Sequence, residues 1–107
     1  YYFRAEWVRE KLRTNPENIR ALLVGGDSMS PTLCADDMIL VDVSFKNPNP
    51  AGLYMIFDGV GIAPKRIELT SPGKVSVRSD NPQYSSYETS SDELDIVGKI
   101  VWLAREL

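Results

Sequence analysis

The stretch VGGDSMSPTL, residues 24–33, lies between two apolar segments and decides how the chain on either side of it can fold. Glycine, aspartate, serine and proline are the common turn residues, so the stretch predicts a turn. The flanking segments IRALLV (19–24) and MILVDV (38–43) then predict two strands, the second of them buried. Ser28, inside the turn, has two interpretations: it is one more turn residue, or it is displayed there as a nucleophile.

The rest of the chain predicts a mostly β fold with one short helix in front of it. The segment RAEWVREKLR (4–13) contains good helix formers and predicts a short amphipathic helix. Residues 80–93 are mostly polar and predict a long loop, while Gly98 predicts a bulge or bend in the last strand. We therefore divide the chain into a helical lead-in segment (1–18) and a β domain (19–107). The further predicted strands are LYMIFDG (53–59) and GIAPKRIEL (61–69), which form a hairpin, VSVRS (75–79) and LDIVGKIVWLA (94–104).

Composition excludes several classes of protein. The 107 residues, 43% hydrophobic and 25% charged, fit one globular domain. The net charge of −3 lacks the basic excess of a nucleic-acid-binding domain, so any DNA contact is expected from another part of the protein. No apolar stretch reaches the roughly 20 residues that span a bilayer, and no signal-peptide pattern is present. A single cysteine, Cys34, cannot form an internal disulfide, which fits a reducing cytoplasm.

The chain contains no histidine. This count excludes the Ser-His-Asp triad, Cys-His catalysis and the usual zinc ligand sets. Nucleophilic chemistry at Ser28 would therefore need a different base, and a lysine is the main candidate.

Lys65 is the lysine whose position in the sequence best fits that role. In a strand the side chains alternate between two faces, so Lys65 shares an apolar face with Ala63 and Ile67, while Arg66 is expected to face solvent. Two interpretations are open: the ammonium group reaches water past the sheet, or burial disfavours the charged form and leaves an amine that can accept a proton from serine. Pro64 lacks a backbone donor, so this strand is expected at an edge or a bend, where a peptide can dock.

Five quoted segments together resemble the LexA-like serine peptidases, the C-terminal domains of LexA, of UmuD and of many phage repressors. GDSMSPTLCADDMILVD resembles the nucleophile segment of the family, with ADD in place of its usual DGD turn. PKRIE resembles the segment that carries the base, and the interval of 37 residues from Ser28 to Lys65 suits the family. SDNPQY with IVGKIVW resembles the closing region, and FRAEWVRE resembles the helix before the domain in phage-type repressors.

The resemblance implies a LexA/signal-peptidase-like β domain of curved antiparallel sheets that carries a Ser-Lys dyad. Ser28 would be the nucleophile and Lys65 the general base, held neutral by apolar surroundings. Backbone N–H groups around Asp27, Ser28 and Met29 would stabilise the oxyanion. No metal or cofactor is expected. The glycines would allow the substrate backbone to approach closely, and the residues expected to contact substrate are Gly25, Gly26 and Pro64.

The resemblance also implies partners and a regulatory role in the cytoplasm. Family members usually cut their own linker at an Ala-Gly or Cys-Gly bond upstream of the peptidase domain, promoted by a RecA filament on single-stranded DNA. The same domain forms a homodimer, and a helix-turn-helix domain outside this chain would bind operator DNA; no membrane contact is expected. Cleavage separates the two domains and lifts repression.

Two departures keep alternatives open. The sole Ala-Gly pair is Ala51-Gly52, after Ser28, so the scissile bond lies before Tyr1 or the protein does not cleave itself. Pro64 stands where LexA-like sequences usually carry a hydrogen-bonding residue. A dimerisation or inducer-sensing module that does not cleave is therefore the alternative function, and a signal-peptidase-like enzyme acting on other proteins is a third. Among the remaining residues we expect ordinary turn, packing or surface roles for Cys34, Asp36, Asp37, Trp7 and Trp102, and a position over the site or in a dimer contact for Tyr84 and Tyr87.

Overall fold

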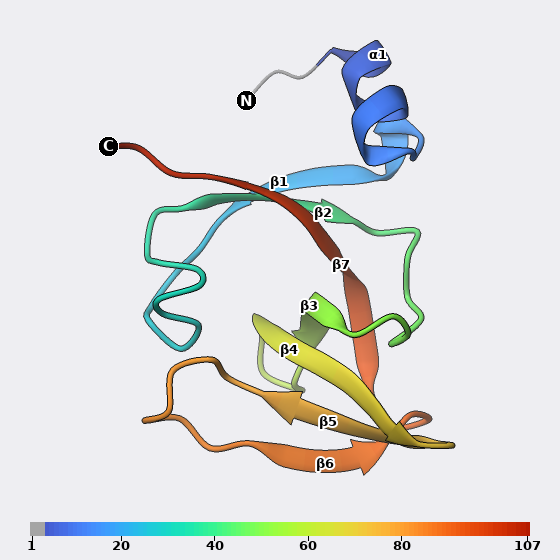
Figure 1. Ribbon diagram of the computed structural model, residues 1–107, viewed down its shortest axis with the longest axis vertical. Coiled ribbons are helices and arrows are strands. Elements are labelled where there is room, and N and C mark those ends of the chain that lie inside the picture. The colour runs from blue at the N-terminus through green and yellow to red at the C-terminus, as the bar shows by residue number, and fades with distance from the viewer. Residues whose placement is uncertain (1–3) are drawn as a thin grey trace.

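A computed structural model describes residues 4–107. The chain folds into one seven-stranded sheet in which every neighbouring pair is antiparallel, with the strand order β1-β2-β7-β3-β4-β5-β6 (Figure 1). The mostly β fold class with a short N-terminal helix is therefore confirmed. The strands are β1 (Ile19–Leu23), β2 (Met38–Asp42), β3 (Gly52–Phe57), β4 (Ile62–Ser71), β5 (Lys74–Arg78), β6 (Tyr87–Ser90) and β7 (Asp95–Ala104).

The sheet curves so strongly that it encloses two hydrophobic clusters. Figure 1 shows β1 and β2 in one half of the molecule and β5 and β6 in the other, with β7 running between them. Because side chains alternate along a strand, β3 supplies both clusters: Met55 packs in the first, and Tyr54 and Ile56 pack in the second. The two halves therefore share a central pair of strands, β3 and β7.

The predicted turn after β1 is fastened to the first cluster by its own apolar residues. Met29 and Leu33 are fully buried, and they pack with Ile39 and Val41 of β2. Full burial of side chains of this size contributes about 1.5–3 kcal/mol each. All five residues of β2 are buried, as the run of apolar residues predicts. The part of the loop that follows Ser28 is thus held by packing.

The described part of the lead-in segment, residues 4–18, is helical in three short stretches and packs against β7. It consists of a short α-helix, α1 (Ala5–Trp7), a π-helical turn, η1 (Val8–Leu12), and a 3-10 turn, η2 (Pro16–Asn18). Val8 is buried, and the ring of Trp7 meets the ring of Trp102 edge-on at 5.4 Å between centroids. No helix among residues 4–107 is long and apolar enough to cross a membrane.

The bulge predicted at Gly98 is present. Met55 pairs with Gly98 and the next residue of β3 pairs with Ile96, so Val97 has no partner on β3. A Cβ atom on Gly98 would lie 2.5 Å from the carbonyl oxygen of Asp42. Glycine is therefore required here because the backbone of β2 approaches too closely for any side chain.

One prediction for the second half of the chain was wrong. The polar residues 80–93 contain a strand, β6, that pairs with β5 through residues 87–90. The residues of β6 are exposed or half-buried, because β6 is an edge strand whose hydrogen bonds with β5 do not require an apolar face. An apolar alternation could not reveal such a strand.

Candidate active site

Ser28 lies in a tightly turned loop, residues 24–37, which connects β1 to β2. The Ser30 N–H donates to the Asp27 carbonyl at 3.1 Å, so a turn closes around Ser28. Gly26 has a φ of +73°, a conformation that favours glycine, and it lets the chain reverse directly before Asp27. Met29 points into the core, whereas Ser28 is half-buried. The local sequence thus presents the serine and anchors its neighbour.

An apolar cavity of about 210 Å³ lies beside Ser28, between the end of β1 and the start of β4. Two of the three residues predicted to contact substrate line it, Gly25 and Pro64, whereas Gly26 does not. Except for Ser28 and Gly25, the lining side chains are apolar, so the cavity fits an uncharged side chain. The lining residues are Leu22, Leu23, Val24, Gly25, Ser28, Ile39, Met55, Ile62, Ala63 and Pro64.

The part of β4 that lines the cavity has one side without a neighbouring strand. Residues 62–67 pair with β3, but the pairing of β4 with β5 begins only at Arg66. Pro64, which cannot donate a backbone hydrogen bond, lies in the stretch with the free side. The prediction of an edge or bend at Pro64 therefore holds locally, although β4 as a whole lies inside the sheet. A peptide could pair with this free side as an added strand.

Lys65 follows Pro64 on β4 and is half-buried. Its Nζ donates a hydrogen bond to the Ser79 Oγ at 2.8 Å, and Ser79 is only 8% exposed. Among residues 4–107, the Ser28 hydroxyl has no hydrogen-bond partner, and it does not bond to Lys65. The two predicted catalytic side chains therefore do not contact each other, and Lys65 bonds instead to Ser79, two residues before Asn81, which bonds to the Ser28 carbonyl.

The backbone around Ser28 has free donors. Within the part of the chain that the structure describes, the N–H groups of Asp27, Ser28 and Met29 have no acceptor. Unpaired N–H groups beside a serine are the geometry that an oxyanion needs. Titratable residues do not gather as metal ligands: the described residues hold no group of three or more cysteine, aspartate or glutamate side chains that could bind a metal ion.

The segment after Ser79 contacts the Ser28 loop directly. The backbone N–H of Asn81 donates to the Ser28 carbonyl at 3.0 Å, and its side-chain Nδ2 donates to the Asp27 carbonyl at 3.0 Å. The Tyr84 hydroxyl donates to the Asp27 carboxylate, and this bond raises the pKa of Tyr84 above its ordinary value. Tyr84 therefore lies on the Ser28 loop, which is one of the two positions expected for it.

Asp80 joins the same loop to β4. It accepts two hydrogen bonds from Arg66, at 2.7 and 2.8 Å, and a third from the Thr32 hydroxyl. The Arg66 guanidinium, helped by Thr32, holds the pKa of Asp80 below its ordinary value. We expected Arg66 to face solvent; its side chain is indeed 36% exposed, but it also pairs with the Asp80 carboxylate, which the sequence did not predict.

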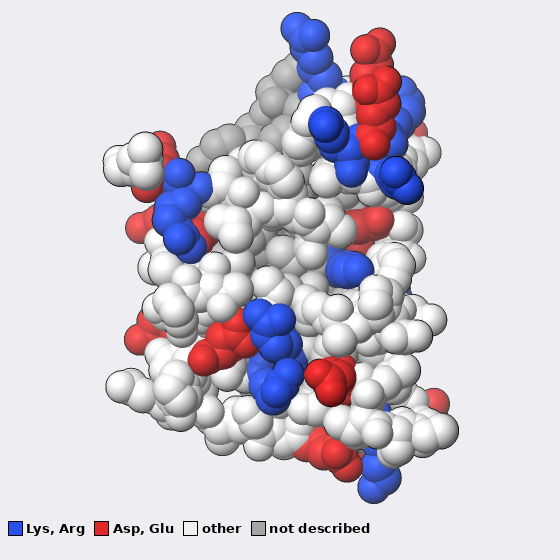
Figure 2. Space-filling model, in the orientation of Figure 1, with Lys and Arg blue, Asp and Glu red and all other residues white. Residues whose placement is uncertain are grey.

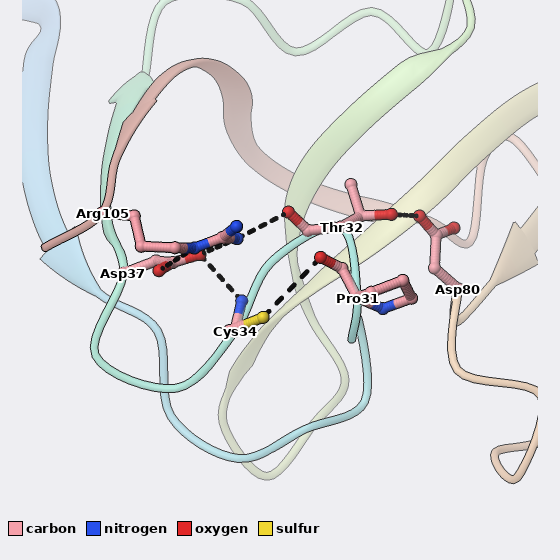
Figure 3. A network of polar contacts seen from close by, with 6 residues as sticks. All are labelled: Pro31, Thr32, Cys34, Asp37, Asp80 and Arg105. Atoms are coloured by element: carbon pink, nitrogen blue, oxygen red, sulfur yellow. Dashed lines mark hydrogen bonds and ion pairs between the residues drawn. The ribbon is translucent and has the colours of Figure 1, made fainter. Parts of the chain in front are cut away.

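Asp37 closes the other end of the loop, where we expected a solvated turn. It is only 2% exposed and accepts hydrogen bonds from the Arg105 Nε and Nη2, at 2.8 and 2.6 Å, and from the Cys34 N–H at 2.8 Å. Arg105 first, and then Cys34, lower the pKa of Asp37 to about 2. Figure 3 shows Thr32 between Arg105, which donates to its carbonyl, and Asp80, which accepts from its hydroxyl. Two carboxylates thus fasten the loop from opposite sides.

Sequence reasoning predicted Ser28 and Lys65 as catalytic candidates but did not predict the residues that contact their segments. The structure adds five polar residues to the site, and their partners are distant in sequence. The one signal for some of them was the likeness of SDNPQY to the closing region of a known family. The added residues are Thr32, Asp37, Ser79, Asp80 and Asn81.

Comparisons with known proteins bear on the same region. The model of the Peptidase S24-like family matches residues 1–101. The chain is 31% identical over 88 residues to the 26 kDa repressor protein of Escherichia phage HK022, which covers 79% of this chain and 37% of that protein. It is 30% identical over 77 residues to the repressor protein CI of Enterobacteria phage phi80, 72% of this chain and 33% of that protein. An uncharacterized HTH-type transcriptional regulator of Haemophilus influenzae is 29% identical over 100 residues, 90% of this chain and 41% of the relative. The chain thus spans less than half the length of each of these relatives.

Proposed function

The chain belongs to the peptidase S24-like family, and from this premise we propose that it is the regulatory domain of a phage-type transcriptional repressor that cleaves its own linker with Ser28 and Lys65. One observation carries the proposal of cleavage. Ser28, whose hydroxyl has no hydrogen-bond partner among the described residues, lines the cavity. Residues 62–64 of β4, in the stretch with a free side, line it as well, and Lys65 directly follows Pro64. A peptide that pairs with β4 there would bring its carbonyl to Ser28.

The first half of the reaction transfers the peptide's acyl group to the serine. The neutral amine of Lys65 takes the proton of the Ser28 hydroxyl while the Oγ attacks the carbonyl carbon of the scissile bond. The carbonyl oxygen becomes an oxyanion, which the N–H groups of Ser28 and Met29 would stabilise. The Lys65 ammonium then gives its proton to the departing nitrogen, the C–N bond breaks, and an acyl ester on Ser28 remains.

The second half releases that ester with water. Lys65, neutral again, takes a proton from a water molecule whose oxygen attacks the ester carbonyl. The resulting oxyanion collapses, the bond to the Ser28 Oγ breaks, and the ammonium returns its proton to the serine. One water is consumed for each peptide bond cut, and both residues end in their starting states.

The cavity and the strand edge define the substrate class. The substrate is an extended peptide with an uncharged side chain next to the scissile bond, because the side chains that line the cavity are mostly apolar. Ala51-Gly52 does not fit this role, since Gly52 is already the first residue of β3 and pairs with Ile67. We therefore assign the scissile bond to a segment before residue 1, in keeping with an upstream linker.

The repressor context is supported by two relatives that are named as phage repressors. In this proposal the chain forms a homodimer, and a helix-turn-helix domain elsewhere in the protein binds the operator. In Figure 2 several Lys and Arg side chains gather at the top with acidic side chains among them, and the rest of the face shown carries charges of both signs. A RecA filament is the proposed promoter of cleavage.

The test is self-cleavage of the full-length protein at alkaline pH, which favours the neutral form of lysine amines in general. We expect one defined cut upstream of residue 1, located by mass spectrometry, and its loss in Ser28→Ala and Lys65→Ala. Lys46→Ala, which removes an exposed lysine, is the matched control and should cleave normally. A cut that persists in both dyad variants would exclude this assignment, and a wild type that never cuts, even with RecA filament, would favour the module that only dimerises or senses an inducer.

A further inference from the structure

Ser28 and Lys65 do not touch each other, yet one continuous segment contacts both. This segment, Ser79–Asn81, directly follows β5, and each of its three residues makes a polar contact with the β1–β2 loop or with β4. We propose that Ser79–Asn81 is the positioning segment of the site: Ser79 orients the amine of Lys65, and Asn81 orients the peptide groups on both sides of Ser28. The inference rests on the proposed function, but it concerns residues that the proposed function does not itself require.

Ser79 controls the direction of the amine. A neutral amine has two N–H bonds and one lone pair, and only the lone pair can accept the serine proton. When one N–H donates to the Ser79 Oγ at 2.8 Å, rotation about the Cε–Nζ bond is restricted, and the lone pair can be directed toward Ser28. Ser79 is 8% exposed, so water competes little for this bond. Without Ser79 the amine would sample orientations in which it cannot act as a base.

Asn81 controls the direction of two N–H groups. It binds the carbonyls of Asp27 and Ser28, which belong to the two successive peptide groups that carry the N–H of Ser28 and the N–H of Met29. Both peptide bonds are trans, and in a trans peptide the C=O and N–H point in opposite directions. Because both carbonyls point toward Asn81, the N–H groups of Ser28 and Met29 point away from it. They are then unpaired donors that can bind an oxyanion.

Asp80, between them, ties the two halves of the site together. Its carboxylate binds Arg66, the residue after Lys65, and Thr32 of the Ser28 loop, and its N–H donates to the Met29 sulfur at 3.4 Å. The Asp80 side chain is 14% exposed, whereas its partner Arg66 is 36% exposed, so the pair is partly shielded from water on the side of the carboxylate. The positioning segment thus determines the distance between the Ser28 loop and Lys65. It does so through charge-assisted hydrogen bonds of Asp80 to Thr32 in that loop and to Arg66, the residue after Lys65.

The kinetic test compares Ser79→Ala, Ser79→Thr and Asn81→Ala with wild type in the alkaline self-cleavage assay of the full-length protein. We expect Ser79→Ala and Asn81→Ala to slow cleavage about 100-fold, the loss typical of a misplaced catalytic group. The deficit should persist above about pH 10.4, where a lysine is neutral without help. Ser79→Thr keeps the hydroxyl and should restore most of the rate. Ser86→Ala, an exposed serine in the same loop, should cleave like wild type.

A second readout does not depend on cleavage. A sheltered, hydrogen-bonded lysine ammonium exchanges slowly, so Lys65 should give its own ¹H–¹⁵N side-chain signal, identified by its loss in Lys65→Arg. We expect this signal to vanish in Ser79→Ala and to return in Ser79→Thr. In Asn81→Ala we expect the amide of Ser28 to exchange faster with deuterium, because the side-chain bond to the Asp27 carbonyl is lost, whereas the Met29 amide is the internal reference, because the backbone bond from Asn81 to the Ser28 carbonyl remains. If Ser79→Ala fails to fold, Ser79→Cys, with its weaker acceptor, replaces it and should weaken both readouts.

The outcomes separate the two proposals. If wild type cleaves and needs Ser28 and Lys65, but Ser79→Ala and Asn81→Ala cleave at the wild-type rate, the positioning role is excluded and the proposed function stands. If wild type does not cleave, the proposed function fails, and the two exchange measurements alone decide the positioning role. Unchanged signals for Lys65 in Ser79→Ala and for Ser28 in Asn81→Ala would then overturn it.

Discussion

Two neighbouring acids have opposite environments, and the contrast shows what one residue contributes to the site. Asp36 is exposed with a left-handed φ of +70°, whereas Asp37 is buried beneath Arg105. A carboxylate that accepts two bonds from a guanidinium and one from a backbone N–H is strongly favoured in its charged form. Asp37 therefore fastens the Ser28 loop to the end of β7 as long as it keeps its charge.

The first prediction follows from the low pKa of Asp37. Its pKa is about 2 in the folded protein, against an ordinary value of 3.8, so the folded state binds this proton less tightly than the unfolded state. The resulting stabilisation is complete above about pH 4 and is lost as the pH falls from there through about 2. Asp37→Asn should lower stability at neutral pH and flatten the acid limb of a plot of unfolding free energy against pH, measured by denaturant titration.

The matched control for this prediction is Asp36→Asn. Because Asp36 is exposed, its replacement should leave both the neutral stability and the acid limb of wild type. Asp80, whose pKa is also lowered, contributes to the acid limb in every variant, so the comparison is made between the two substitutions. Equal acid limbs for Asp36→Asn and Asp37→Asn would contradict the assignment.

At the scale of single residues, the sequence predicted the candidate catalytic side chains but not the residues that hold them in place. The absence of histidine and the apolar face around Lys65 were enough to pair Lys65 with Ser28 as candidates. Ser79 and Asn81 carry no local pattern, because what matters is which carbonyl or amine lies opposite them in the fold. Asp37 was assigned to solvent, since nothing near it in sequence indicates that Arg105 lies 68 residues away across the sheet.

At the scale of elements, β7 determines whether the two halves of the molecule join. It lies between β2 and β3, and its bulge places Gly98 against the backbone of β2. The apolar pattern predicted β7 and its bulge, but no pattern predicts that the last strand inserts between β2 and β3. The edge strand β6 was missed for the opposite reason, because it has hydrogen bonds but hardly any apolar burial.

The second prediction concerns this close approach. Gly98→Ala places a Cβ 2.5 Å from the Asp42 carbonyl oxygen and 2.8 Å from the Val41 Cγ1, and backbone atoms cannot move aside cheaply. We expect a loss of at least about 2 kcal/mol in unfolding free energy, within the range for overpacked cores. Gly61→Ala is the control, since a Cβ there meets nothing within 4 Å. Equal stabilities of the two variants in denaturant titrations would show that β2 and β7 are not in contact as described.

At the scale of the whole molecule, the candidate site depends on segments from both halves of the curved sheet. The Ser28 loop packs on the first cluster, Lys65 comes from β4, and Ser79–Asn81 follows β5 of the second cluster. Figure 1 shows the β1–β2 loop and the β5–β6 connection on the same side of the sheet, where their hydrogen bonds join. The architecture thus brings together three segments that are far apart in sequence.

The central claim, that Lys65 activates Ser28 as a nucleophile, has a test that needs no knowledge of the scissile bond. We predict that a fluorophosphonate reacts with the full-length protein at alkaline pH: the Ser28 Oγ displaces fluoride from phosphorus while Lys65 takes the proton. Mass spectrometry should then find one adduct on the peptide that contains Ser28, unchanged in Ser30→Ala and absent in Ser28→Ala and Lys65→Ala. An adduct on another residue, or an adduct on Ser28 that forms at the same rate in Lys65→Ala, would contradict the claim.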